Sequence, residues 1–311
     1  MNLALSFPPD KPFDVVGLGL NSVDLLCVVP EYPKFNTKTR LQGCQMLGGG
    51  QVATALALCG RYGLRARYLG KVGSDERGRF SRTSLEAEPI DLSGLITVEG
   101  AYNQFAVILI DARNGERTIL WDRDPALRFD PGEWGKEMVC SGKVLHLDGH
   151  DVPASIQAAA WAKEDGIPVV LDGDTVREGY EELLQHVDIL ISSERLPERL
   201  TGIPSLEKGL KEISSRYNCL LTGATLGREG SLAYYQGKFI RTPGHPVECV
   251  DTTGAGDVFH GAFIYGMLQG WNVEDILSFS NVAAALKCTR QGARAAIPAL
   301  NEVQSAWQKS H

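Results

Sequence analysis

The sequence contains neither a long apolar run nor a block of like charge. Its first residues, MNLALSFPPDKPFD, have an early acidic residue and prolines, and no basic segment followed by an apolar one. We therefore expect no signal peptide, no transmembrane helix and no membrane partner. The formal net charge is -7. This balance argues against a nucleic-acid partner, although a few local Lys or Arg side chains could hold an anionic substrate.

Paired cysteines are also missing. The seven cysteines form no CxxC motif, and their number is odd. Most lie in apolar runs, where a free thiol packs as a small hydrophobic side chain. This usage favours a reducing cytoplasm over a disulfide framework, so we expect a cytoplasmic protein. The cysteines are Cys27, Cys44, Cys59, Cys140, Cys219, Cys249 and Cys288.

The chain does contain a regular alternation of β-rich runs and segments of helical period. Its 43% hydrophobic residues can form a large core. The alternation predicts one α/β domain over 1–311, with a mainly parallel sheet covered by helices on both faces. Strands are expected at 13–20, 66–72, 144–147, 168–171, 189–192 and from 220 onward, and helices at 52–62, 75–87, 154–165, 205–217 and 258–268.

Two segments, 25–47 and 104–121, contain extended runs with no helix beside them. Within the second, Asn114-Gly115 separates two apolar runs and predicts a hairpin. We interpret both segments as strands of a small sheet apart from the main one. Such a sheet could close over a ligand as a lid, or could merely extend the main sheet, and periodicity does not distinguish the two.

The most informative stretch is Val250-Asp251-Thr252-Thr253-Gly254-Ala255-Gly256-Asp257, which leads into an apolar helix. Gly254 and Gly256 allow a tight turn whose backbone N–H groups, with the helix N-terminus behind them, form an anion site. Asp257 in the first helical turn could simply favour the helix dipole. A carboxylate beside a phosphate site is better explained as a general base that accepts a proton from a hydroxyl group.

Two common nucleotide motifs are absent. The turn lacks the lysine of the GxxxxGK[ST] loop, and Gly17-Leu18-Gly19 is not followed by a third glycine in phase. The chain is therefore neither a Walker-type NTPase nor a credible dinucleotide oxidoreductase.

The motifs together resemble the ribokinase-like (PfkB) carbohydrate kinase family. DTTGAGDVFHGAF at 251–263 matches the C-terminal signature, and LGGGQVAT at 47–54 resembles the N-terminal one. The resemblance implies a doubly wound α/β fold with a small β lid, and ATP-dependent phosphorylation of a sugar hydroxyl. Asp257 would be the catalytic base, and Gly254, Ala255 and Gly256 the anion hole. The lid is also where a homodimer would form.

The resemblance also assigns substrate residues. Asp24 would bind sugar hydroxyls, or would be a strand-end turn residue. The glycine run Gly48, Gly49 and Gly50 would let the backbone approach the sugar, or would only serve the turn. Lys38 falls where a relative contacts an anionic group. Asp148 and His150, after the strand at 144–147, complete the candidate substrate set.

The nucleotide would lie against Thr225, Gly227 and Gly230, with Asn281 either facing the adenine or solvated on its helix. Mg²⁺ would arrive mainly on the nucleotide phosphates. The glutamate of the family's Asn-x-x-Glu motif is missing from Ser193-Glu194-Arg195-Leu196, although Glu194 is close by. Asp251 and the backbone near Arg290 and Gly292 correspond to a monovalent-cation site in some members, which adds K⁺ as a candidate.

Leu171-Asp172-Gly173-Asp174 replaces the usual Asn-Pro strand ending. With the run 285–290, this stretch resembles the sulfofructose kinase branch and, more distantly, ketohexokinase. An arginine expected after 144–148 is absent, because Gly149-His150-Asp151 stands there, so the sugar is not assigned. The alternatives that remain open are a nucleoside or small-alcohol kinase of the same fold and a non-catalytic sugar sensor.

Overall fold

A computed structural model of the chain describes residues 1 and 3–309. The main sheet has nine strands in the order β13-β12-β11-β10-β9-β8-β1-β4-β5. Every neighbouring pair from β5 across to β11 is parallel, and β12 and β13 extend the sheet as antiparallel strands. The strands are β1 (Val15–Leu18), β4 (Ala66–Gly73), β5 (Asp91–Val98), β8 (Leu145–Leu147), β9 (Val169–Gly173), β10 (Ile189–Ser193), β11 (Leu221–Thr225), β12 (Ser231–Tyr235) and β13 (Lys238–Thr242).

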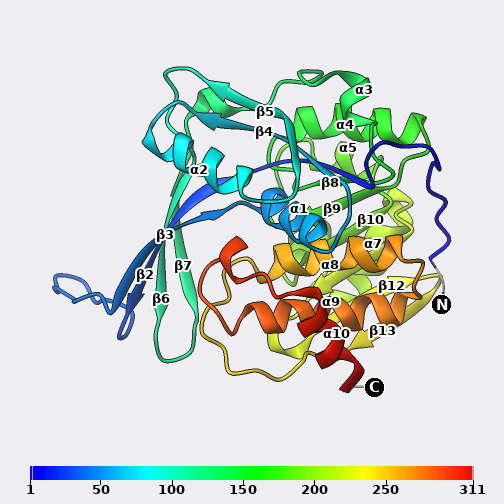
Figure 1. Ribbon diagram of the computed structural model, residues 1–311. Coiled ribbons are helices and arrows are strands. Elements are labelled where there is room, and N and C mark those ends of the chain that lie inside the picture. Colours follow the sequence, from blue (N-terminus) through cyan, green and yellow to red (C-terminus); the bar gives the residue numbers. More distant parts are fainter. Residues whose placement is uncertain (2, 310–311) are drawn as a thin grey trace.

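Helices cover both faces of this sheet (Figure 1). Adjacent residues of β1 show the two faces, since Val15 packs in a cluster with α1, α8 and α9, whereas Val16 packs with α4, α5 and α7. One face carries α1 (Gln51–Arg61), α2 (Glu76–Glu86), α8 (Ala255–Leu268) and α9 (Val273–Lys287), with α10 (Leu300–Lys309) against α9. The other carries α3 (Gly135–Val139), α4 (Val152–Glu164), α5 (Tyr180–Leu184), α6 (Leu196–Thr201) and α7 (Leu206–Tyr217).

A second sheet of four strands has the order β3-β2-β6-β7. It contains β2 (Ser22–Val29), β3 (Gly43–Gly49), β6 (Phe105–Asp111) and β7 (Arg117–Asp122). In Figure 1 this small sheet stands off from the main body at the left, and the loop between β2 and β3 projects furthest from it. Short 3₁₀ turns complete the chain: η1 (Pro125–Leu127), η2 (Gly227–Glu229) and η3 (Arg294–Ala296).

The predicted α/β class, the parallel sheet and the separate small sheet are confirmed. Several details differ, among them helices α3, α5, α6, α9 and α10, which are not among those expected from the alternation along the sequence. The first strand of the small sheet begins at Ser22, so Asp24 lies inside a strand and is not a strand-end turn residue. The predicted hairpin forms, but its loop spans 112–116 and is not a two-residue Asn-Gly turn. Strand β5 was not predicted, because its burial is irregular and gives no clear alternation.

The strand order places a crevice at one end of the main sheet. Strand β1 lies between β4, which follows it in the chain, and β8, which comes much later. Connections therefore leave the carboxyl ends of β1 and β8 in opposite directions, and ligands of open α/β sheets bind at such a switch point. Among the described residues no helix is both long and apolar enough to cross a membrane.

Candidate active site

A cleft of about 1140 Å³ lies along the carboxyl ends of the parallel strands. Its walls come from the ends of β9, β10 and β11, the segment that enters α8, and the inner face of the small sheet. The N-terminal glycine run and the C-terminal glycine-rich turn meet at this cleft. Gly50 and Asp257 both line it, although they are far apart in the sequence. The size and the mixed lining suit a nucleotide together with a second small molecule.

The glycine-rich turn forms one wall. Gly254 has φ 77°, a left-handed conformation that favours glycine, and a Cβ there would lie 2.5 Å from the Cβ of Ala293. Gly256 has nothing within 4 Å of its Cβ position, so its backbone stays open to the cleft. Gly254, Ala255 and Gly256 all line the cleft at the start of α8, a 14-residue helix. This end of the helix can therefore hold an anion.

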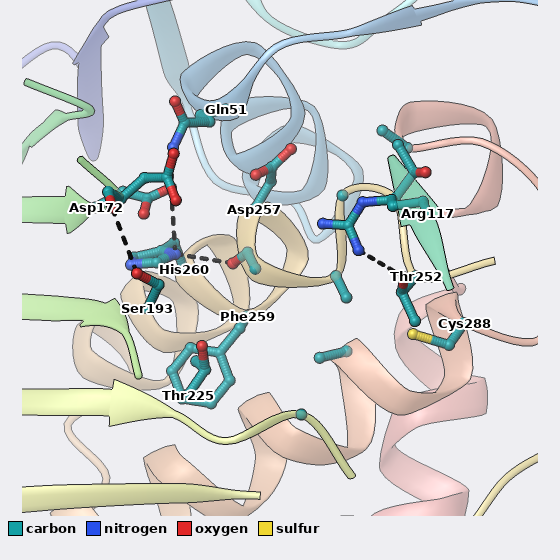
Figure 2. A pocket seen from close by; sticks show the side chains of 18 of the residues that line it. Gln51, Arg117, Asp172, Ser193, Thr225, Thr252, Asp257, Phe259, His260 and Cys288 are labelled. Atoms are coloured by element: carbon teal, nitrogen blue, oxygen red, sulfur yellow. Dashed lines mark hydrogen bonds and ion pairs between the residues drawn. The ribbon is translucent and has the colours of Figure 1, made fainter. Parts of the chain in front are cut away.

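Asp257 lies in the first turn of α8 and points into the cleft (Figure 2). Desolvation raises the pKa of Asp257 to about 7, with a further contribution from the negative charge of Asp172. His260 and Arg117 act in the opposite direction. A carboxyl group with a pKa near neutrality is suited to accept a proton during the reaction.

Asp172 and His260 lie beside this base. Asp172, at the end of β9, accepts a hydrogen bond from Gln51 (3.1 Å), and its carboxylate is 3.7 Å from Nδ1 of His260. Burial and the nearby Asp174 raise the pKa of Asp172 well above its usual range. The ring nitrogens of His260 face the carbonyl oxygens of Gly256 (2.8 Å) and Ile191 (3.2 Å), so His260 connects the first turn of α8 to β10.

Asp24 lies on the small-sheet side of the cleft. Its carboxylate is buried, accepts a hydrogen bond from Ser22 (2.7 Å), and lines the cleft. Burial raises the pKa of Asp24. A Cβ on Gly49 would lie 2.0 Å from this carboxylate, so the glycine provides the space that Asp24 occupies.

The predicted glycine run separates into three different positions. Gly50 has φ 97° and lines the cleft at the start of α1. Gly49 makes room for Asp24, and a Cβ on Gly48 would lie 2.0 Å from the buried guanidinium of Arg294. The structure therefore places only Gly50 directly at the cleft, and Gly48 packs away from it.

Four other predicted residues, Lys38, Glu194, Asp148 and Asp251, do not line the cleft. Lys38 is exposed on the loop between β2 and β3, and Glu194 is exposed beyond the end of β10. Asp148 is buried behind the wall, where it accepts hydrogen bonds from the N–H groups of Leu20 (2.6 Å) and His150 (3.0 Å). Burial raises the pKa of Asp148 to about 6. Asp148 thus shapes the wall through Leu20 and His150.

His150 does line the cleft, with its Nδ1 3.0 Å from the guanidinium of Arg177 and its ring edge-on to Trp121. The predicted nucleotide residues Thr225, Gly227, Gly230 and Asn281 lie at the opposite end. Asn281 donates from its side chain to Ser231 (3.1 Å) and to the carbonyl of Thr242 (3.2 Å), so it is not a freely solvated helix residue.

Sequence reasoning missed Arg117, Gln51 and Asp172 as site residues. Arg117 reaches from β7 to the hydroxyl of Thr252 (2.5 Å) at the glycine-rich turn, as Figure 2 shows. Asp172 carried a usable signal, since it ends a predicted parallel strand, where ligand-binding side chains gather. Arg117 carried none beyond its place among the charged residues of the small sheet.

Neither predicted metal contact is supported by its placement. Among the described residues, no three His, Cys, Asp or Glu side chains are grouped to hold a metal ion. Glu194 is exposed and does not line the cleft, whereas Asp174 lines it. The residues fit a Mg²⁺ that arrives with a nucleotide and meets few protein ligands.

The contacts that Asp251 makes do not fit a free monovalent cation bound to it. The two carboxylate oxygens of Asp251 accept the N–H groups of Thr253 (2.8 Å) and Gly292 (2.7 Å). Its carbonyl oxygen accepts the ammonium of Lys287 (2.7 Å). The positive charge at this position is therefore already part of the protein.

Comparisons with known proteins agree with this geometry. The chain is 27% identical to an ATP-dependent ribose-1-phosphate kinase of Halopiger xanaduensis, over 91% of this chain and 94% of that protein. It superposes on a ribokinase-like protein of Agrobacterium tumefaciens with a TM-score of 0.89 and 30% identity, covering 96% and 98% of the two chains. For Arabidopsis thaliana ribokinase complexed with ribose and ATP, the TM-score is 0.82 and the identity 25%, over 95% and 99%.

A family profile described as pfkB family carbohydrate kinase matches residues 13–300, nearly the whole chain. The match includes the glycine run that enters α1, the cleft at the strand ends, and the turn that enters α8. The finer resemblance to sulfofructose kinases stays a prediction. This chain belongs to the pfkB family of carbohydrate kinases.

Proposed function

We propose that the protein transfers the γ-phosphoryl group of ATP to a hydroxyl group of a sugar or sugar derivative. The observation that carries the proposal is Asp257 in the first turn of α8, directly beside an anion-binding turn and with a pKa of about 7. The substrate oxygen would attack the γ-phosphorus while the bond to the bridging oxygen of ADP breaks. The hydroxyl proton would pass to Asp257.

The other residues of the cleft would stabilise the phosphoryl group and bind ATP. The N–H groups at Gly254 to Gly256 would stabilise charge on the transferring phosphoryl group. ATP would extend from there toward Thr225, Gly230 and Asn281. Mg²⁺, when bound with ATP, would neutralise charge on the phosphate oxygens. The Arabidopsis relative is described with ribose and ATP, which supports a sugar and a nucleotide as the pair of ligands.

The sugar would lie between Asp24, Gln104 and Asp172. Asp24 can accept hydrogen bonds from hydroxyl groups, because only Ser22 donates to it among the contacts above. The side-chain oxygen of Gln104 is buried without a hydrogen-bond partner among the described residues, and Gln104 lines the cleft. Buried acceptors of this kind favour a ligand with several hydroxyl donors.

An anionic sugar is a second candidate substrate. Lys38, on which that idea first rested, is exposed and outside the cleft. Arg177 instead lines the cleft at the sugar end, beside His150. A guanidinium there could bind a phosphate or sulfonate group.

The small sheet would close over the sugar as a lid. Its inner face supplies Asp24, Ala106, Ile108 and Trp121 to the cleft. Closure would exclude water and protect the phosphoryl group from hydrolysis.

The outer face of the small sheet is apolar and unpartnered in the single chain, which supports a homodimer formed through it. Strand alternation places Leu25, Val107 and Leu109 on that face. The partly exposed Leu120 and Met46 lie on it as well. A second copy of the chain would cover these side chains. Sedimentation of the wild type and of Leu120→Glu tests this, because a dimer of the first and a monomer of the second are expected, and a monomeric wild type contradicts it.

All seven cysteines are free thiols, which supports a reducing compartment and hence the cytoplasm as the site of action.

A panel of substrates tests the proposed reaction. Aldo- and keto-sugars, their phosphates, a sulfonated sugar and nucleosides would be incubated with Mg·ATP, and both ADP release and the phosphorylated product would be measured. We expect one sugar class to give ADP and sugar phosphate in equal amounts. A nucleoside as the preferred acceptor would favour the small-alcohol alternative. Tight sugar binding without any product would favour a sugar sensor.

A further inference from the structure

Lys287 is the last residue of α9, and its side chain is completely buried. Its ammonium donates to the carbonyl oxygen of Asp251 (2.7 Å) and lies 3.8 Å from the Asp251 carboxylate, which is also completely buried. Burying both members of such a charge pair costs solvation free energy, so the pair is weak evidence for a role in stability.

The pair lies directly behind the anion turn. Asp251 immediately precedes the run Thr252–Gly254, and its carboxylate holds the N–H group of Thr253. The N–H groups of Val250 and Asp251 in turn bond to the carbonyl of Cys288, the residue after Lys287. Figure 2 shows Cys288 beside Thr252. The end of α9 and the start of the turn are therefore fixed to each other around one ammonium group.

Lys287 interacts electrostatically with Asp251 and, more weakly, with Asp257. Burial lowers the pKa of Lys287, whereas Asp251 and Asp257 both favour its charged form. A compact positive charge at this depth adds to the positive potential of the turn, where the phosphoryl group would gain negative charge.

We propose that Lys287 is a positioning residue that acts as the protein's own monovalent cation, so that the anion turn is held in its active form without potassium. This inference rests on the proposed phosphoryl transfer. It follows from the contacts of Asp251, in which an N–H group occupies each carboxylate oxygen and the ammonium of Lys287, bonded to the carbonyl oxygen, supplies the positive charge that a free cation would otherwise bring.

Two substitutions separate a cation role from a merely structural one. Lys287→Ala removes the charge and leaves a cavity, which potassium or ammonium ions can enter. Lys287→Met removes the charge but fills the same space. Lys211→Ala, on the exposed face of α7, is the matched control.

Activity would be compared in potassium chloride and in tetramethylammonium chloride at equal ionic strength. We expect wild-type and Lys211→Ala kcat to be the same in both salts. Lys287→Ala should lose roughly 10- to 10²-fold in kcat without potassium, since the turn is misplaced, and should recover in its presence. Lys287→Met should show the loss without the recovery. A wild type that requires potassium, or a fully active Lys287→Met variant, would overturn the proposal.

Thermal unfolding gives a readout that does not depend on kinase activity. Potassium should raise the Tm of Lys287→Ala above its value in tetramethylammonium, because an ion that binds only the folded state stabilises it. It should leave the Tm of the wild type and of Lys287→Met unchanged. If no sugar is phosphorylated but these Tm shifts appear, the proposed function fails and the cation role of Lys287 stands. If Lys287→Ala shows no potassium-specific shift, the cation role fails. Should neither variant fold, the potassium dependence of the wild type decides.

Discussion

Arg117 on β7 donates a hydrogen bond across the cleft to the hydroxyl of Thr252, 2.5 Å away. The contact joins the small sheet to the glycine-rich turn that enters α8, although the two segments are far apart in the sequence (Figure 2). Arg117 therefore places a fixed positive charge next to the N–H groups of the anion turn. A guanidinium in this position can both hold the small sheet closed and meet charge on a phosphoryl group.

Replacing Arg117 should slow the reaction much more than it weakens ATP binding. We expect Arg117→Ala to lose roughly 10²-fold in kcat, because one charged donor to the transferring group is removed. Arg117→Lys should recover only part of this, since an ammonium lacks the fork geometry of a guanidinium. Arg40→Ala, on the exposed loop between β2 and β3, is the control. Equal kcat for Arg117→Ala and Arg40→Ala would show that the Thr252 contact has no part in catalysis.

Sugar binding should order the small sheet. Backbone N–H groups of β6 and β7 should exchange hydrogen more slowly with substrate bound, because closure adds contacts and excludes water. Hydrogen exchange followed by mass spectrometry measures this, and α7 on the far face of the main sheet serves as the internal reference. Unchanged exchange in β6 and β7 with a proven substrate would mean that the small sheet is not a lid.

Burial of Asp257 is the main cause of its raised pKa, and the nearby Asp172 should shift further the pH at which the enzyme becomes active. Asp257 must be deprotonated to accept a proton, so kcat/KM should rise with pH through the pKa of Asp257, which is about 7. The negative charge of Asp172 raises that pKa. Asp172→Asn removes this charge, so the acid limb of the pH profile should move to lower pH. An acid limb at unchanged pH would show that Asp172 does not affect the pKa of Asp257.

Substituting alanine for Gly48 or for Gly49 should have two different effects, one on stability and one on sugar binding. Gly49→Ala places a methyl group against the carboxylate of Asp24, so it should raise the KM for sugar and leave ATP binding unchanged. Gly48→Ala instead meets the buried guanidinium of Arg294, so it should lower the Tm. Steady-state kinetics and thermal unfolding of both variants test this. A higher sugar KM for Gly48→Ala without loss of stability would restore the direct substrate role first assigned to Gly48.

Much of the fold could be predicted because local patterns and tertiary structure agree. The apolar run around Val15 and Val16 is buried on both faces, as a central parallel strand requires. Strand β5 could not be predicted, since its residues alternate irregularly between buried and partly exposed positions. The length of the loop at 112–116 depends on how β6 pairs with β7, and Asn114-Gly115 alone does not determine that register.

Site residues could be predicted where one short motif contains both the glycines that shape the backbone and the side chain that reacts. Gly254, Gly256 and Asp257 are such a case. It was not predictable where one residue depends on distant ones. Lys38 seemed suitable by its spacing, but it does not line the cleft, and the loop that carries it projects from the small sheet away from the main body (Figure 1). Lys287 was noted only as part of the run 285–290, and only the packing of α9 against residues 250–254 reveals its partner.

The central claim is that Asp257 is the base for phosphoryl transfer from ATP to a sugar hydroxyl, and a single-turnover measurement of Asp257→Asn tests it most directly. The variant should keep the wild-type fold and affinity for ATP, because the amide has nearly the same size and shape as the carboxyl group. With saturating ATP and the best sugar of the panel, its rate of sugar phosphate formation should fall by roughly 10²-fold or more. A rate close to that of the wild type would contradict the account.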